Sequence, residues 1–270
     1  MSELRDKMNA VLLNLPSKPF YAAKKTDPKN LRELLKALAP IETNHPLVRM
    51  GPPTDGGYLL PSDLDDISTC FSPGVSIVSG FEMECAARGM DVYMADASVE
   101  APPDAHPKFR FLKKYLGAYS HDEFITMDHW IESAAPDPSL DWLFQMDIEG
   151  AEYEVILNMP EAYLRRFRTI VIEFHFLDYL FDEVFFRLAS CAFRKLLVNH
   201  SCVHIHPNNC SSTISSNGIA IPKIMEFTFH RNDRIAVRNH ATTFPHPLDC
   251  ECVPDLPPLV LPPCWYNSMR

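Results

Sequence analysis

The chain has 270 residues, of which 46% are hydrophobic and 22% are charged, a balance typical of a soluble globular protein with one large domain. Its net charge of −10 disfavours an anionic membrane or a nucleic-acid backbone as a partner. No apolar run reaches the roughly 18 residues of a membrane span. The 9 glycines form neither a Gly-x-Gly-x-x-Gly nor a Gly-x-x-x-x-Gly-Lys motif, which disfavours a standard NAD-binding domain and a P-loop nucleotidase.

Residues 1–50 predict an N-terminal helical appendage. Asp27 and Pro28 are typical of a helix start, and Pro40 ends the pattern. The leucines between them form one apolar stripe at helical spacing, namely Leu31, Leu34, Leu35 and Leu38. Residues 1–20 carry acids ahead of a short apolar core, so we expect no signal peptide and a cytoplasmic protein.

Residues 51–240 predict an α/β domain in which strands and helices alternate, with parallel crossovers. The expected strands are 68–75, 92–96, 109–116, 142–147, 169–175, 202–206 and 224–230. The expected helices are 79–88, 120–133, 152–167 and 179–199, the first two starting with the capping boxes Ser79-x-x-Glu82 and Ser120-x-x-Glu123. No helix separates the last two strands, and a polar loop over 207–217 joins them, so we expect the last strand to be antiparallel.

Acidic residues follow several of the buried strands. Asp96 ends the second strand, Asp147 and Glu149 follow the fourth, and Glu173 and His175 end the fifth. Ligands of open α/β sheets bind at the carboxyl ends of the strands. The sequence therefore predicts a site at this edge of the sheet.

Five short motifs together resemble the FkbM-type methyltransferase family over residues 50–210. They are Asp55-Gly56-Gly57-Tyr58, Phe71-Ser72-Pro73-Gly74-Val75-Ser76 with Phe81-Glu82, Asp96, Asp147-Ile148-Glu149-Gly150-Ala151-Glu152, and Glu173-Phe174-His175. The resemblance implies a Rossmann-like, seven-stranded class I methyltransferase sheet with helices on both faces. It also implies methyl transfer from S-adenosylmethionine to oxygen on a sugar, a glycan or a small secondary metabolite.

The resemblance places the cofactor against the ends of the first three strands. We expect it to contact Ser72, Gly74, Glu82, Asp96, Ala97 and Gly117. Gly74 would allow close backbone approach, and Asp96 would accept hydrogen bonds from the ribose. Glu82 has an alternative role in the capping box, and Gly117 lies in a stretch that resembles the one lining the adenine.

Asp147, Glu173 and His175 are the expected catalytic residues, with His175 as the base that deprotonates the hydroxyl. An alternative is a site for Mg²⁺ or Mn²⁺ formed by Asp147, Glu173, His175 and His206. His206 would be remote if the last strand inserts between the fifth and sixth strands. Glu149 could instead begin the next helix, where a carboxylate is favourable.

Residues 241–270 predict an extended tail rich in proline and cysteine. We expect the 8 cysteines to be reduced thiols, with a zinc site of His246, Cys250, Cys252 and Cys264 as the alternative. Two other functions remain open. One is a metal-dependent hydrolase using Asp147, Glu149, Glu173, His175, His204 and His206. The other is a non-catalytic protein that retains the fold, which the single-glycine turn at Gly74 favours.

Overall fold

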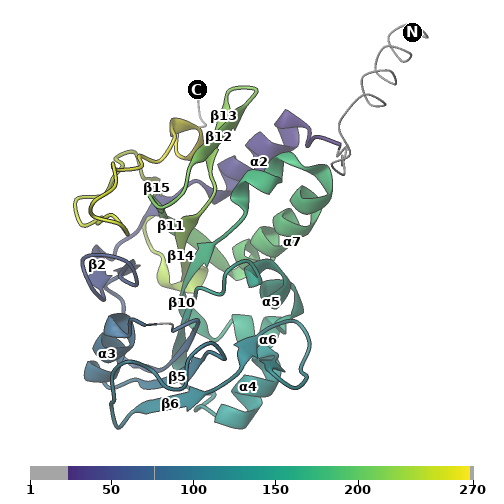
Figure 1. Cartoon of the computed structure of the whole chain (residues 1–270). Helices are drawn as coiled ribbons and strands as arrows, with labels where there is room; N and C mark the ends of the chain where they lie inside the picture. Colours follow the sequence, from purple (N-terminus) through teal and green to yellow (C-terminus); the bar gives the residue numbers. More distant parts are fainter. Residues whose placement is uncertain (1–23, 76, 268–270) are drawn as a thin grey trace, which may run out of the picture.

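A seven-stranded sheet runs through the centre of the molecule in the computed structural model, which describes residues 24–75 and 77–267 (Figure 1). Across the sheet the strands are β11 (His200–Pro207), β14 (Met225–Arg231), β10 (Phe167–Phe174), β9 (Asp141–Met146), β4 (Ile67–Pro73), β5 (Asp91–Ala95) and β6 (Phe109–Leu112). Strand β14 lies between β10 and β11 and is antiparallel to both, whereas β10, β9, β4, β5 and β6 are mutually parallel. The predicted mostly parallel sheet with an antiparallel last strand is confirmed.

The two faces of the sheet pack against different elements, because side chains alternate along each strand. Leu143 of β9 belongs to a core cluster with Phe81 and Cys85 of α3 (Gly80–Ala87). Its neighbour Phe144 belongs to a second cluster with Ile156 of α5 (Glu152–Asn158) and with buried residues of α4 (Met127–Ala134) and α7 (Glu183–Asn199). Helices therefore cover both faces (Figure 1).

Two predicted helices are interrupted. The helix expected over 152–167 divides into α5 and α6 (Glu161–Leu164), because Pro160 has no N–H to continue the ladder. The helix expected over 179–199 becomes a 3₁₀ turn, η1 (Leu177–Phe181), followed by α7. The side chain of Asp182 accepts hydrogen bonds from the backbone N–H groups of Val184 and Phe185 at the start of α7.

Both predicted capping boxes are wrong. Ser79 does precede α3, but its hydroxyl donates to Asp104 (2.8 Å). Helix α4 begins only at Met127, because the hydroxyl of Ser120 accepts from the backbone N–H of Thr126 and closes a loop there. The strand expected over 109–116 stops at Leu112, and β7 (Tyr115–Leu116) pairs separately with β8 (Phe124–Ile125).

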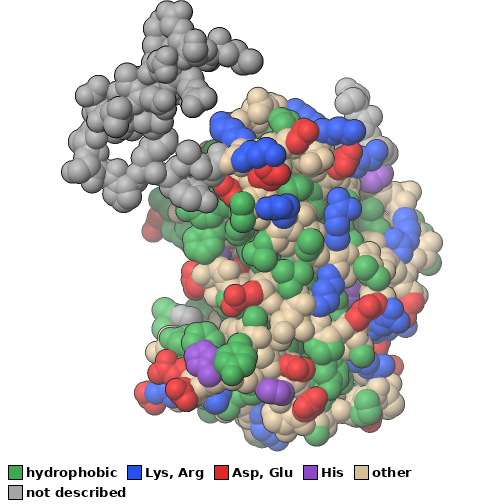
Figure 2. Space-filling model, turned by 90° about the vertical axis from the view of Figure 1, so that its right-hand side faces the viewer, with side chains coloured by type: hydrophobic (Ala, Val, Ile, Leu, Met, Phe, Trp, Pro, Cys, Tyr) green, Lys and Arg blue, Asp and Glu red, His purple; other side chains and the backbone are tan. Residues whose placement is uncertain are grey.

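The predicted N-terminal helix is confirmed as α2 (Pro28–Leu38). Asp27 accepts a hydrogen bond from the N–H of Lys29, and all four leucines of the stripe are buried in the cluster that contains α7. Figure 2 shows acidic and basic side chains mixed over most of the exposed surface on this side, with Lys and Arg gathered at its upper end. The predictions for residues 1–23 lie outside the described residues.

Three small two-stranded ribbons accompany the main sheet in addition to the β7–β8 pair. Strand β1 (Ile41–Glu42) pairs with β15 (Asn239–His240), and β2 (Leu47–Met50) pairs with β3 (Tyr58–Pro61). The loop expected over 207–217 contains instead the first strand of a hairpin of β12 (Thr213–Ser216) and β13 (Ile219–Pro222). Its two-residue turn is Asn217-Gly218, both at positive φ, which is a typical hairpin signal that the sequence analysis overlooked.

The C-terminal tail lies against the β11 side of the sheet (Figure 1). Its described part contains a 3₁₀ turn, η3 (Pro263–Trp265), and another 3₁₀ turn of the same length, η2 (Asn232–Arg234), precedes β15. Trp265 is fully buried, and its indole N–H donates to the carbonyl of Ala220 (3.0 Å). Among the described helices, none has the length and apolar composition needed to cross a membrane.

Candidate functional site

The turn after β9 presents two acids at the carboxyl edge of the sheet. Asp147 follows Met146, the last residue of β9, and Glu149 has a φ of 57°. This left-handed conformation is unusual for a residue other than glycine, and it leaves the Glu149 side chain 87% exposed. Helix α5 begins at Glu152, so Glu149 stands before the helix and not within its first turn.

The imidazole of His175 gathers three carboxylates at this edge. Its Nε2 atom lies 3.4 Å from Glu149 Oε2, 3.9 Å from Asp147 Oδ1 and 3.9 Å from Glu173 Oε1. Asp147, Glu173 and His175 therefore lie together, as the order of the strands predicted. The Oδ1 atom of Asp147 is buried and accepts no hydrogen bond. The amide of Asn208 donates to Glu173 Oε1 (2.9 Å) and holds that side chain in place.

A fourth acid, Glu152, contacts the other nitrogen of the same ring. Its Oε1 atom lies 3.1 Å from His175 Nδ1 and accepts a hydrogen bond from the backbone N–H of Gly150 (2.9 Å). Its side chain is completely buried. No site role was predicted for Glu152, although this acid closes the Asp147–Glu152 motif. No signal in the sequence distinguishes it from an ordinary acid in the first turn of a helix.

Burial and mutual repulsion shift the pKa values of these groups. Burial raises the pKa of Asp147 to about 7, opposed by the nearby His175 and assisted by Glu149 and Glu152. Burial also raises the pKa of Glu173 well above its ordinary value, with Asp147 and Glu226 adding to the effect. For His175, burial lowers the pKa, but the hydrogen bond to Glu152 and the surrounding acids outweigh it and raise the pKa. The edge therefore favours a positively charged or proton-donating ligand.

A small cavity of about 70 Å³ adjoins this edge between β4, α3 and the loop before β3. It is lined by Asp55, Tyr58, Gly74, Glu82, Gln145 and Asp147, among others. Asp55, Tyr58 and Gln145 were missed by the sequence analysis. The signals that could have found them are the Asp-Gly-Gly-Tyr motif and the lone amide within the apolar run of β9.

A buried polar chain forms one wall of this cavity. Ser72 Oγ lies 2.5 Å from Glu82 Oε1 and 2.6 Å from Gln145 Oε1, and the Gln145 amide donates to Tyr58 Oη (3.1 Å). One hydroxyl has one proton to donate, so a protonated Glu82 completes the chain by donating to Ser72. Burial raises the pKa of Glu82 to about 7, which favours that protonated form.

The other expected cofactor residues follow β5 and β7. Asp96 is buried directly after β5, and its Oδ1 accepts from the backbone N–H and the hydroxyl of Ser98. Ala97 follows it and is half-buried. Gly117 follows β7, where its N–H donates to the carbonyl of Ile125 (3.0 Å).

His206 is separated from Asp147, Glu173 and His175, the expected catalytic residues. It lies on β11, and β14 stands between β11 and β10. Its Nδ1 atom lies 3.5 Å from Asp249 Oδ2 of the tail, and Asp249 Oδ1 lies 2.8 Å from His204 Nε2. The expected metal set of Asp147, Glu173, His175 and His206 is thus not brought together. Within the described residues, the ligand atoms that come within 4.8 Å of one another at this edge belong to Asp147, Glu149 and His175.

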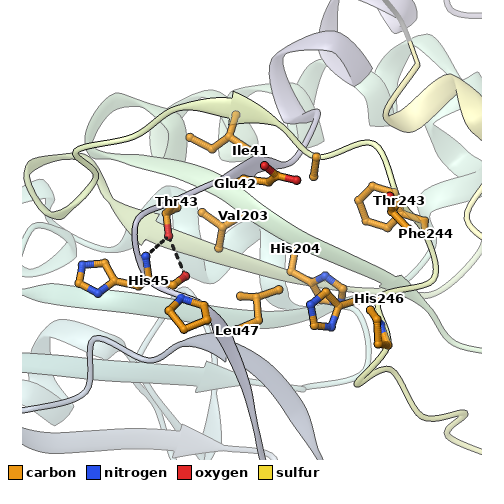
Figure 3. A pocket seen from close by; sticks show the side chains of 13 residues that line it. Ile41, Glu42, Thr43, His45, Leu47, Val203, His204, Thr243, Phe244 and His246 are labelled. Carbon is orange, nitrogen blue, oxygen red and sulfur yellow. Dashed lines mark hydrogen bonds between the residues drawn. The ribbon is translucent and has the colours of Figure 1, made fainter.

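His204 lines a separate cavity of about 290 Å³ between the tail and the segment around β1 (Figure 3). Figure 3 shows His204 beside His246 at one end of this cavity and His45 at the other. His204 and His206 therefore contact Asp249 of the tail and do not lie beside Asp147, Glu173 and His175. This placement removes two of the six residues expected for a metal-dependent hydrolase.

The cysteines of the tail point to separate partners. Cys252 donates to Glu226 Oε1 (3.4 Å), Cys264 to the carbonyl of Ala220 (3.4 Å) and Cys250 to the carbonyl of Leu248 (3.8 Å). The described residues do not form a zinc cluster from these thiols and His246. All eight cysteines are free thiols.

Residues 95–195 match the family model of the methyltransferase FkbM domain. No curated protein matches the chain. A solved structure from Pyrococcus horikoshii, described as a proposed RNA methyltransferase, is similar over 84% of this chain and 98% of its own, with 11% identity and a TM-score of 0.33. The order and direction of the seven strands in the main sheet define the fold. Residues 95–195, which include Asp96, Asp147, Glu173 and His175, are thus similar to the methyltransferase FkbM domain.

Proposed function

We propose that this protein transfers a methyl group from S-adenosylmethionine to a hydroxyl of a sugar, a glycan or a small secondary metabolite. One observation carries the proposal. The buried acid after β5 and the group formed by Asp147, Glu173 and His175 lie along one carboxyl edge, where a nucleoside cofactor and its acceptor can meet.

The cavity beside Gly74 suits the amino-acid end of the cofactor. Its volume of about 70 Å³ accommodates a few atoms, and its walls carry Glu82 and Asp55, which can accept hydrogen bonds from an ammonium group. Asp96 would accept from the ribose hydroxyls. The positive sulfonium would then lie toward Asp147, where the carboxylates favour it.

The acceptor hydroxyl would meet the donor methyl group beside His175. Methyl transfer is an in-line displacement, so the residues must place the hydroxyl oxygen behind the methyl group and remove its proton. Asp147 and Glu173 would orient the acceptor by accepting hydrogen bonds from its other hydroxyls. The Nε2 atom of His175 would take the proton, since it faces the same space.

A divalent cation, Mg²⁺ or Mn²⁺, is a second element of the proposal. Asp147, Glu149 and His175 would hold it, and the buried, unbonded Oδ1 of Asp147 fits this role. When bound, such a cation lowers the pKa of a hydroxyl that it contacts. In either arrangement His175 must present a bare Nε2 toward Asp147.

Isothermal titration calorimetry with S-adenosylmethionine, with and without Mg²⁺, tests the proposal. We expect one cofactor per chain, with a Kd of about 1 µM to 1 mM, as is common for enzyme substrates. Incubation with radiolabelled cofactor and a panel of sugars would then identify the acceptor. An absence of cofactor binding, together with metal-dependent ester hydrolysis, would reject the proposal in favour of a hydrolase.

A further inference from the structure

His175 has two ring nitrogens in very different surroundings. Its Nδ1 atom lies within hydrogen-bond distance of Glu152 Oε1, at 3.1 Å. Its Nε2 atom faces Glu149, Asp147 and Glu173 at 3.4 to 3.9 Å, and none of these contacts is a hydrogen bond. When the ring carries one proton, the geometry therefore favours its position on Nδ1.

The side chain of Glu152 is held firmly beside His175 Nδ1. It is the first residue of α5, where the partial positive charge of a helix start favours a carboxylate. The N–H of Gly150 donates to the same oxygen that faces His175, so that oxygen cannot swing away without losing two hydrogen bonds. The other oxygen, Oε2, is buried and has no partner. Burying a carboxylate is costly, and the contact with His175 offsets part of that cost.

The backbone of His175 is held from a second side. The hydroxyl of Tyr153, the next residue of α5, donates to the carbonyl of His175 (2.7 Å). Two consecutive residues of α5 thus fix the ring and the main chain of His175. A flip of the ring about its Cβ–Cγ bond would put Cδ2 in the place of Nδ1 and break the contact with Glu152.

We infer that Glu152 is a positioning residue, which holds the proton of His175 on Nδ1 and so presents the bare Nε2 to the acceptor. The inference rests on the proposed function, because it gives His175 the tautomer that a proton acceptor or a metal ligand needs. In this arrangement Glu152 would contact neither the methyl donor nor the acceptor hydroxyl, and it would act only through the imidazole of His175.

Nitrogen-15 NMR of the imidazole side chains in the full chain, at a pH where His175 is neutral, tests the inference. His175→Gln identifies the signal. We expect the wild-type ring to carry its proton mainly on Nδ1. Glu152→Gln keeps an acceptor oxygen and should retain that tautomer. Glu152→Leu removes the acceptor, so the proton should move to Nε2, toward the three carboxylates, and change the tautomer ratio about tenfold or more.

Three results would overturn the inference. They are a wild-type ring protonated on Nε2, a Glu152→Leu ring with the wild-type ratio, and a Glu152→Gln ring that has already changed to Nε2. If Glu152→Leu does not fold, the wild-type and Glu152→Gln spectra still decide. Calorimetry with S-adenosylmethionine on the same samples separates the two proposals, because missing cofactor binding rejects the methyltransferase while the tautomer result stands.

Discussion

Gly74 lies so close to Asp147 that a β-carbon built on Gly74 would come within 1.6 Å of the carbonyl oxygen of Asp147. Gly74 has a φ of 86°, which side chains disfavour, and it is where β4 turns away from the sheet. The sequence predicts that this glycine allows close approach of the cofactor. In the structure its missing side chain is already needed within the protein, because the turn after β9 packs directly on the backbone of Gly74.

Gly74→Ala should therefore destabilise the protein and displace Asp147. We expect the left-handed backbone to cost about 1–2 kcal/mol and the clash to raise the loss to about 3–5 kcal/mol of unfolding free energy. Urea denaturation measures this loss. Calorimetry on the folded fraction should also show weakened binding of S-adenosylmethionine.

Gly89→Ala is the matched control. Gly89 has a φ of 95°, but a β-carbon there would have no atom within 4 Å. The Gly89→Ala variant should lose only the backbone contribution of about 1–2 kcal/mol of unfolding free energy. Equal losses in the two variants would show that contact with Asp147 does not constrain position 74.

Asp147→Asn should separate catalysis from cofactor binding. The amide keeps the shape of the side chain but loses its charge and one acceptor oxygen. We expect methyl transfer to fall by at least about 100-fold, as for other groups that act on the reacting hydroxyl. The Kd for S-adenosylmethionine should change by only a few-fold. Radiolabel transfer and calorimetry measure the two quantities.

Asp137→Asn is the control for this change, because Asp137 lies in the loop before β9 and accepts its hydrogen bonds from Ser139. It should leave transfer and binding unchanged. A complete loss of cofactor binding in Asp147→Asn, with transfer unmeasurable for that reason alone, would assign Asp147 to the cofactor and not to the acceptor.

The proximity of Asp147, Glu173 and His175 could be predicted from the sequence, because it depends only on where each strand ends and on which strands are neighbours in this fold class. Each follows a run of apolar residues, and parallel neighbouring strands bring their carboxyl ends to one edge. The insertion of β14 between β10 and β11 follows from the same fold class. That insertion is what separates His206 from the site.

The role of Glu152 could not be predicted in this way. An acid in the first turn of a helix is favourable on a solvated surface as well, so the motif alone does not reveal a buried partner. Glu149 shows the converse problem. Its spacing fits a helix start, yet Gly150 takes a φ of 114° and α5 begins only at Glu152, so Glu149 lies in the turn before the helix. Both outcomes depend on how the turn packs against His175, which is a tertiary contact.

Asp96→Ala should weaken binding of S-adenosylmethionine if this acid holds the ribose. Hydrogen bonds to a charged group contribute about 1.5–3 kcal/mol, which corresponds to a loss of about 10- to 150-fold in affinity. Calorimetry measures it directly. Asp91→Ala, at the opposite end of β5 and paired with Lys108, should leave the affinity unchanged. If both variants bind like the wild type, the cofactor does not lie across the end of β5.

His200 makes the stability of the fold depend on pH. Its Nε2–H donates to the carbonyl of Phe167 (2.7 Å), while Nδ1 is buried without a partner. Burial lowers the pKa of His200 from 6.5 to about 4, although the hydrogen bond to Phe167 opposes this effect. Below pH 6.5 the imidazole of His200 binds a proton in the unfolded chain, whereas in the folded protein it stays neutral until the pH approaches about 4. The stability that the neutral ring provides is thus complete above pH 6.5 and is lost as the pH falls toward 4.

We expect His200→Gln to flatten the acid side of the stability curve. A glutamine amide can donate to Phe167 as the imidazole does, but it does not titrate. For each pH unit that the pH falls from 6.5 to 4, the unfolding free energy of the wild type should decrease by about 1.4 kcal/mol more than that of the variant. Urea denaturation at successive pH values measures both. His240→Gln, on the exposed strand β15, should keep the wild-type slope. Parallel curves for wild type and His200→Gln would mean that the buried Nδ1 accepts its proton in the folded protein as readily as in the unfolded chain.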